Sequence, residues 1–155
     1  MKIFLLVFFV YLSLYSNDKL YSRLDNASHE YTTCAAYFSI AMEAVKKDKK
    51  LKERVESFYK LSRDTSLFYA EKANRTKKMS EKVVVSRYAL ALDSMKNEID
   101  SNYSNFSILI SKYQKHCLEI LKNPDSLFVD ELNMGFLQNQ KYVCINKGLI
   151  INGKI

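Results

Sequence analysis

Turn-forming residues are almost absent from this sequence, and their scarcity constrains the fold more than any other feature. The 155 residues include only 3 glycines and 1 proline, although 48% of the residues are hydrophobic. Sandwiches and barrels need turn residues about every 8 to 12 positions, so the composition disfavours a β-rich fold. The length suits one domain with a single core. We therefore predict an all-α protein.

Apolar residues recur at spacings of three and four in four successive segments, which is the pattern of amphipathic helices. The predicted helices span residues 29–47, 51–73, 81–99 and 106–121. Short polar breaks separate them, and short connections make neighbouring helices antiparallel. The sequence therefore predicts an antiparallel, up-down-up-down four-helix bundle.

Residues with known capping preferences mark the expected helix ends. Asn26 or Ser28 is a candidate N-cap for the first helix, and Ser80 for the third. Asn74 would close the second helix in a left-handed conformation. The fourth stops before Pro124, because proline cannot easily continue a helix.

The first sixteen residues, MKIFLLVFFVYLSLYS, carry an apolar run from Ile3 to Tyr15. This run is shorter than the roughly 20 residues needed to span a bilayer, and it fits the central region of a secretory signal peptide. We predict a signal peptide over 1–16, with a cleavage site as late as residue 22 as a second option, and export to the periplasm or extracellular space. An uncleaved membrane anchor and a buried N-terminal helix are the alternatives.

The remaining chain divides into three parts. Residues 17–28 form a polar lead-in, residues 29–123 form the helical bundle, and residues 124–155 form a C-terminal extension. This short tail is expected to be irregular or to form a hairpin turning at Lys147 and Gly148.

Two cysteines are expected to meet. Cys34 lies near the start of the first predicted helix and Cys117 near the end of the fourth, both on apolar stripes. Antiparallel first and fourth helices would place the two thiols in one layer, where an oxidising compartment would join them. The bond would close a loop of 83 residues. In the chain-entropy model, the lost freedom of the unfolded chain would stabilise the folded state by about 4 kcal/mol. Cys144 is then left free, linked to a second chain, or in competition for one of the other two thiols.

Zinc is the competing interpretation of these cysteines, because His29 and His116 lie near them. However, His29 is rotated about 140° from Cys34 around a helix, and His116 about 100° from Cys117. We predict no metal site.

Motifs for catalysis are missing. The sequence has no C-x-x-C pair, no glycine-rich phosphate loop and no complete H-E-x-x-H motif, and its glutamates fall mostly on polar helix faces. We therefore predict that the protein is not an enzyme, and we assign no catalytic residue and no cofactor.

The formal charge of +7 comes largely from basic clusters at 46–54 and 75–82. Both clusters fall at predicted helix connections, so we expect them to be solvent-exposed turns. We predict no nucleic-acid binding, and membrane contact only through an uncleaved N-terminal segment. The leading hypothesis is an exported, non-enzymatic protein that binds another macromolecule, for example a protein partner. Association with the cell envelope is the other form of this hypothesis. The alternative is a small-molecule or metal-binding bundle with a ligand groove lined by Tyr31, Phe38, Tyr88 and Tyr113.

Overall fold

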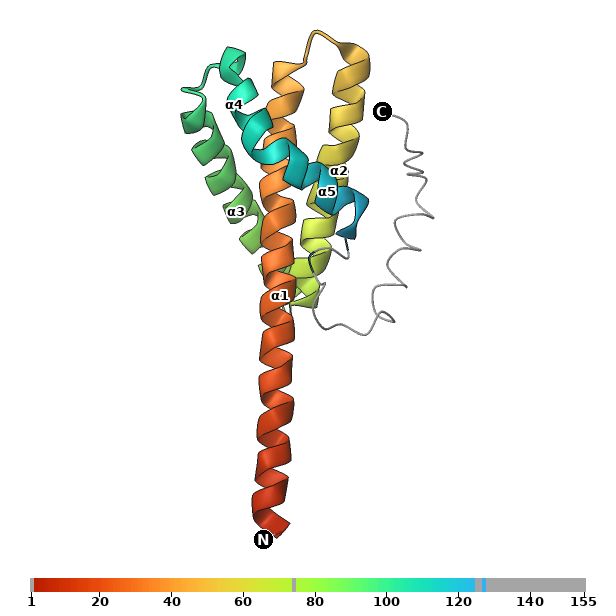
Figure 1. Ribbon diagram of the computed structural model, residues 1–155, viewed down its shortest axis with the longest axis vertical. Helices are drawn as coiled ribbons and strands as arrows, with labels where there is room; N and C mark the ends of the chain where they lie inside the picture. Colours follow the sequence, from red (N-terminus) through yellow and green to blue (C-terminus); the bar gives the residue numbers. More distant parts are fainter. Residues whose placement is uncertain (1, 74, 125–126, 128–155) are drawn as a thin grey trace.

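The computed structural model describes residues 2–73, 75–124 and 127 (Figure 1). Every regular element within these residues is helical, which confirms the all-α prediction. The elements are α1 (Lys2–Ala44), α2 (Lys49–Lys72), α3 (Lys77–Glu98), the 3-10 turn η1 (Tyr103–Asn105), α4 (Ser107–Leu109), the π-helical turn η2 (Ile110–Gln114) and α5 (Lys115–Lys122). The first 123 residues contain neither glycine nor proline, so no residue in them interrupts a helix by its own backbone chemistry.

The longest helix, α1, is the centre of the packing. It contacts α2, α3, η1, η2 and α5. Figure 1 shows α2 along one flank of α1 and α3 along the other, with the α4–η2–α5 segment crossing α1. The helices share one hydrophobic core, to which α1 contributes more buried residues than any other element of the described chain.

Part of α1 is enclosed on all sides. The five consecutive residues from Cys34 to Phe38 are all buried. A helix with a single packed face would expose at least one of five neighbours, because five residues span more than a full turn. The predicted single stripe was therefore too narrow for this helix, which is covered by partners from three directions.

The start of the first helix was predicted wrongly. Residues 17–28 are not a lead-in outside the helix, because α1 runs through them without a break, and neither Asn26 nor Ser28 is an N-cap. Leu24, Ala27 and Ser28 are buried here, and Leu20 packs against the core. These positions continue the helical spacing of the Tyr31 stripe, but the polar residues between them hid the pattern.

The N-terminal part of α1 extends beyond the helices that pack on its second half (Figure 1). Within the described part of the chain, no helix has the length and apolarity that a membrane span requires.

The observed caps differ in part from the predicted ones. Asp48 caps α2, its side chain accepting a 3.0 Å hydrogen bond from the backbone N–H of Leu51. Thr76, not Ser80, caps α3, because the extended backbone at Thr76 lets its hydroxyl accept from the N–H of Met79. Ser80 lies inside the helix and donates to the Thr76 carbonyl. The predicted cap at Asn74 lies outside the described residues, as do the predicted hairpin and Cys144.

Small side chains line the contact between α1 and α2. Thr32 and Ser66 are buried and their hydroxyls lie 2.6 Å apart, within hydrogen-bond distance. Ser28 on α1, and Ser62 and Ala70 on α2, are also fully or almost fully buried. Small residues let two helices approach closely, since the interaxial distance depends on the side chains at the contact.

The fourth predicted helix contains a π-helical turn, η2, between α4 and α5. A π turn holds more residues than an α turn and therefore rotates the following helix relative to the preceding one. Leu109, Cys117 and Ile120 are buried, whereas Ile110, predicted on the same stripe, is 41% exposed. Leu51, predicted on the stripe of the second helix, is likewise exposed, because it lies in the first turn of α2, near the end of the core.

An ionic cluster joins α1 to α3 and to the connection between α2 and α3. The Asp25 carboxylate accepts hydrogen bonds from Arg87 at 2.8 and 3.0 Å and from Arg75 at 2.5 Å. The Asp25 side chain is 24% exposed. The Arg87 bonds lower the pKa of Asp25, burial opposes them, and Arg75 adds to the lowering, so that the pKa lies below its ordinary value of 3.8.

Replacing Asp25 by Asn should lower the free energy of unfolding at pH 7 by about 2 kcal/mol, because two partly buried arginines lose their anion. The pKa of the carboxyl is lower in the folded state than in the unfolded state. Its contribution should therefore be complete above about pH 5 and be lost as the pH falls through the folded-state pKa. Urea unfolding of both proteins at pH 7 and pH 3 measures the difference, which should shrink at pH 3.

Asp64→Asn is the matched control, because the Asp64 side chain is 64% exposed and its partner Arg63 is its neighbour in sequence. Its effect should stay below about 0.5 kcal/mol. An Asp25→Asn effect of the same small size at pH 7 would show that the cluster does not stabilise the fold.

Candidate functional site

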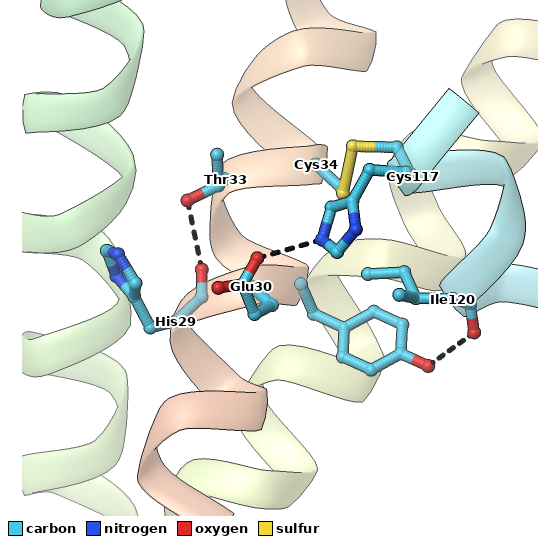
Figure 2. Close-up of a disulfide and its surroundings, with 8 residues drawn as sticks. His29, Glu30, Thr33, Cys34, Cys117 and Ile120 are labelled. Atoms are coloured by element: carbon cyan, nitrogen blue, oxygen red, sulfur yellow. Dashed lines mark hydrogen bonds and ion pairs between the residues drawn. A yellow bond between two sulfur atoms is a disulfide. The ribbon is translucent and has the colours of Figure 1, made fainter. Parts of the chain in front are cut away.

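Cys34 of α1 and Cys117 of α5 form a disulfide, shown in Figure 2. Their Cα atoms lie 5.4 Å apart, inside the usual range for bonded cysteines. Both residues are completely buried. The bond links residues 83 positions apart and so fastens the last described helix to the central one.

A second link between the same two helices lies beside the disulfide. The Tyr31 hydroxyl donates a 2.8 Å hydrogen bond to the backbone carbonyl of Ile120. In a continuing helix this carbonyl would accept from the residue four positions later, but that residue is Pro124, which has no N–H. Tyr31 therefore supplies a donor that the sequence of α5 cannot provide, and it satisfies one of the free carbonyls at the helix end.

A third link is polar and lies at the surface. The Glu30 carboxylate and the His116 imidazole lie 2.9 Å apart, between Oε2 and Nε2. Glu30 is one helical turn before Cys34, and His116 directly precedes Cys117, so the disulfide itself brings them together (Figure 2). Sequence reasoning missed this pair, although the positions flanking a predicted disulfide are a signal that could have found it.

The two histidines do not converge. Figure 2 shows the His29 side chain directed away from the disulfide. His116 instead lies against Glu30. The backbone carbonyl of His29 accepts from the Thr33 hydroxyl at 3.1 Å. Among the described residues, no group of three or more His, Cys, Asp or Glu side chains is arranged to hold a metal ion.

Two of the four predicted ligand-lining residues are packed deep in the core. Tyr31 stacks on Tyr69 with ring centroids 5.7 Å apart. Phe38 lies against Phe58 and Tyr37, at 5.4 and 5.1 Å. Burial raises the pKa of Tyr37 to about 12, so its phenol stays protonated at any ordinary pH.

The other two lie nearer the surface and in different contacts. Tyr88 meets Tyr59 edge to face, with ring centroids 6.3 Å apart, and burial raises its pKa. The Tyr113 hydroxyl donates to Glu98 at 2.8 Å. Phe38 and Tyr113 share the neighbour Tyr37, whose ring centroid lies 5.1 Å from that of Phe38 and 6.2 Å from that of Tyr113, whereas Tyr31 and Tyr88 contact the rings of Tyr69 and Tyr59.

A surface depression lies at the α1–α2 connection, far along α1 from the disulfide. Its volume is about 270 Å³, slightly below the range of about 300–1,000 Å³ that is usual for small-molecule pockets. It is lined by Glu43, Ala44, Lys46, Lys47, Tyr103 and Ser104. Glutamate and two lysines here offer charges of both signs, with no buried polar group to orient a ligand.

Three links therefore connect α1 to α5: a disulfide, a buried hydrogen bond, and a polar contact at the surface between Glu30 and His116. A disulfide with both cysteines fully buried is inaccessible to an attacking thiolate unless the helices first separate. The arrangement therefore suits a structural role for the sulfur atoms. It defines a disulfide-linked protein in which every regular element of the described residues is helical.

Comparison of the chain with protein-family models, curated proteins and solved structures gives no match. The function is accordingly argued from this chain alone.

Replacing both bonded cysteines by alanine should lower the melting temperature by roughly 15 °C, since an 83-residue loop is worth about 4 kcal/mol and each kcal/mol corresponds to about 4 °C. Thermal unfolding followed by circular dichroism measures the shift. Cys144→Ala is the matched control and should leave the melting temperature almost unchanged. A loss of only a few degrees in the double variant would mean that packing alone holds α5 in place.

Replacing Tyr31 by Phe should cost about 2 kcal/mol, because the Ile120 carbonyl would remain buried without a donor. The ring, and with it the stacking on Tyr69, is retained. Chemical denaturation measures the change, and Tyr103→Phe is the control, since Tyr103 is 39% exposed. Equal stability of the Tyr31→Phe variant and the wild type would contradict the assigned role of the hydroxyl.

Proposed function

We propose that this protein is exported, with residues 1–16 acting as a cleaved signal peptide, and that it functions in the periplasm or outside the cell without catalysing a reaction. In this proposal it binds another macromolecule or supports an envelope structure. Its helical body is an antiparallel, up-down-up-down bundle, in which the first and last helices are held together by the Cys34–Cys117 disulfide.

The observation that carries the proposal is the buried disulfide in a chain that begins with a leader-like apolar segment. Disulfides persist in oxidising compartments and are rare in reducing ones. The two features are independent, because the leader lies in residues 1–16 and the cysteines at positions 34 and 117. Export would account for both features.

A binding role is supported by the surface of the described residues. Large apolar side chains are exposed on α2, α3 and the segment after α3; they are Leu51, Met79, Val85, Leu90, Tyr103, Ile108 and Ile110. Three of these, Met79, Val85 and Leu90, lie on α3. The interior is occupied by interlocking aromatic contacts, so a groove among Tyr31, Phe38, Tyr88 and Tyr113, the basis of the small-molecule alternative, is less favoured.

Export is tested by expressing the full chain, leader included, in a bacterium with an oxidising periplasm. The protein should be recovered from the periplasm or medium, and its intact mass should match a chain beginning near residue 17. Oxidation should remove the mass of two hydrogen atoms, and peptide mapping should link Cys34 to Cys117.

A Val7→Arg variant is the matched control, because a charge within the apolar run should block recognition of the leader and leave the protein inside the cell. Equal distribution of both proteins between compartments would contradict export. So would a cytoplasmic wild-type protein with three free thiols.

A further inference from the structure

Helix α3 carries apolar residues on two opposite faces. One face, with Val84 and Met95, is buried in the core. The opposite side is exposed, and Val85 and Leu90, which are 65% and 72% exposed, lie near its two edges, about 140° apart around the helix. A surface helix normally has polar residues opposite its buried stripe. Apolar residues on the second face therefore require a separate explanation.

The exposed stripe has the spacing of a helix-packing surface. Its residues follow one another at intervals of three and one and fall within an arc of about 140°, with Val85 and Leu90 at the two edges and Ser86 and Ala89 nearer the centre. They are Lys82, Val85, Ser86, Ala89, Leu90 and Asp93. This is the i, i+3, i+4, i+7 pattern by which one helix contacts another. All six are exposed, and α3 lies at an edge of the molecule, on the flank of α1 away from α2 (Figure 1).

The stripe also reads the same way in both directions. Its midpoint falls between Arg87 and Tyr88, and the inner residues at equal distances from it match in kind, whereas Lys82 and Asp93 at its ends have opposite charges. Val85 corresponds to Leu90, both aliphatic. Ser86 corresponds to Ala89, both small. Such a stripe is complementary to a second copy of itself turned end to end, which is the arrangement of a two-fold symmetric interface.

The charges at the ends of the stripe select this orientation. In an antiparallel pair, Lys82 of each copy would lie beside Asp93 of the other, giving two ion pairs of opposite charge. In a parallel pair, Lys82 would face Lys82 and Asp93 would face Asp93, so like charges would repel. Exposed ion pairs add little affinity, but they fix register and orientation, and like charges oppose the wrong arrangement. The antiparallel pair also opposes the two helix dipoles.

We propose that two copies of this chain associate through α3, as an antiparallel two-fold helix pair with Val85 and Leu90 at its apolar contacts. Ser86 and Ala89 let the helices approach closely at the centre. The Ser86 hydroxyl is satisfied by the Lys82 carbonyl at 2.9 Å, so it can be covered without losing a hydrogen bond. The inference does not depend on export or on the proposed function, because it concerns a surface away from both the leader and the disulfide.

The association is weak. A single helix pair buries less surface than the 1,200 Å² or so of a standard interface, so the Kd falls in the micromolar range or above. The pairing is therefore a concentration-dependent equilibrium between monomer and dimer.

Sedimentation equilibrium of the exported chain carrying Cys144→Ser, which removes covalent linkage through that thiol, should show this equilibrium between about 10 µM and 1 mM protein. Leu90→Glu should raise the Kd at least tenfold, because it places a charge twice in the apolar contact. Leu51→Glu is the matched control; it puts the same charge on an exposed leucine outside α3 and should leave the Kd unchanged.

Charge reversal tests the register directly. Lys82→Glu and Asp93→Lys, made singly, should each weaken the dimer severalfold, because each brings like charges together twice. The double variant Lys82→Glu/Asp93→Lys should restore the wild-type Kd, since both pairs again have opposite charges. Near-ultraviolet circular dichroism checks that each variant keeps its fold, as expected for residues with exposed side chains.

Three results would overturn the proposal. They are a wild-type chain that stays monomeric up to 1 mM, a dimer that Leu90→Glu does not weaken, and a double charge reversal that remains as weak as the single variants. A monomeric chain that is nevertheless exported and oxidised would reject this interface alone and leave the proposed function standing.

Discussion

The enclosure of α1 by its neighbours is the constraint on which the rest of the structure depends. Five consecutive residues, Cys34 to Phe38, are buried, so helices must cover α1 from several directions. Alanines at positions 35 and 36 keep this part of α1 thin enough for close neighbours, while Tyr37 and Phe38 fill the space between them. The cover comes from α2, α3 and α5, which all contact α1.

The packing of α5 on α1 needs additional links because α5 is short and crosses α1. The α5 helix has 8 residues, too few for a long packing interface. Its attachment combines the Cys34–Cys117 bond, the Tyr31–Ile120 hydrogen bond and the surface contact between Glu30 and His116. All the residues involved lie within about one turn on each helix, so their contributions are coupled and should not simply add.

Sequence periodicity predicted most of the helices but not their limits. The segments 51–73 and 106–121 correspond closely to α2 and to the α4–η2–α5 segment, because alternating apolar and polar residues at helical spacing are a local signal. The start of α1 was misplaced because its stripe at Leu20, Leu24 and Ala27 is interrupted by charged residues. One of these, Asp25, is stabilised by Arg75 and Arg87, which lie 50 and 62 positions away in sequence. No local pattern reveals such partners.

The sequence by itself determined that the described residues are almost entirely helical and where their helices approximately lie. These properties follow from the lack of turn residues and from the spacing of apolar side chains, both of which act over a few residues. Only the tertiary structure decided that α1 is central, that a π turn reorients α5, and that Tyr31, Asp25 and Glu30 find their partners. Those outcomes depend on contacts between residues distant in sequence, whose geometry is set when the helices pack together.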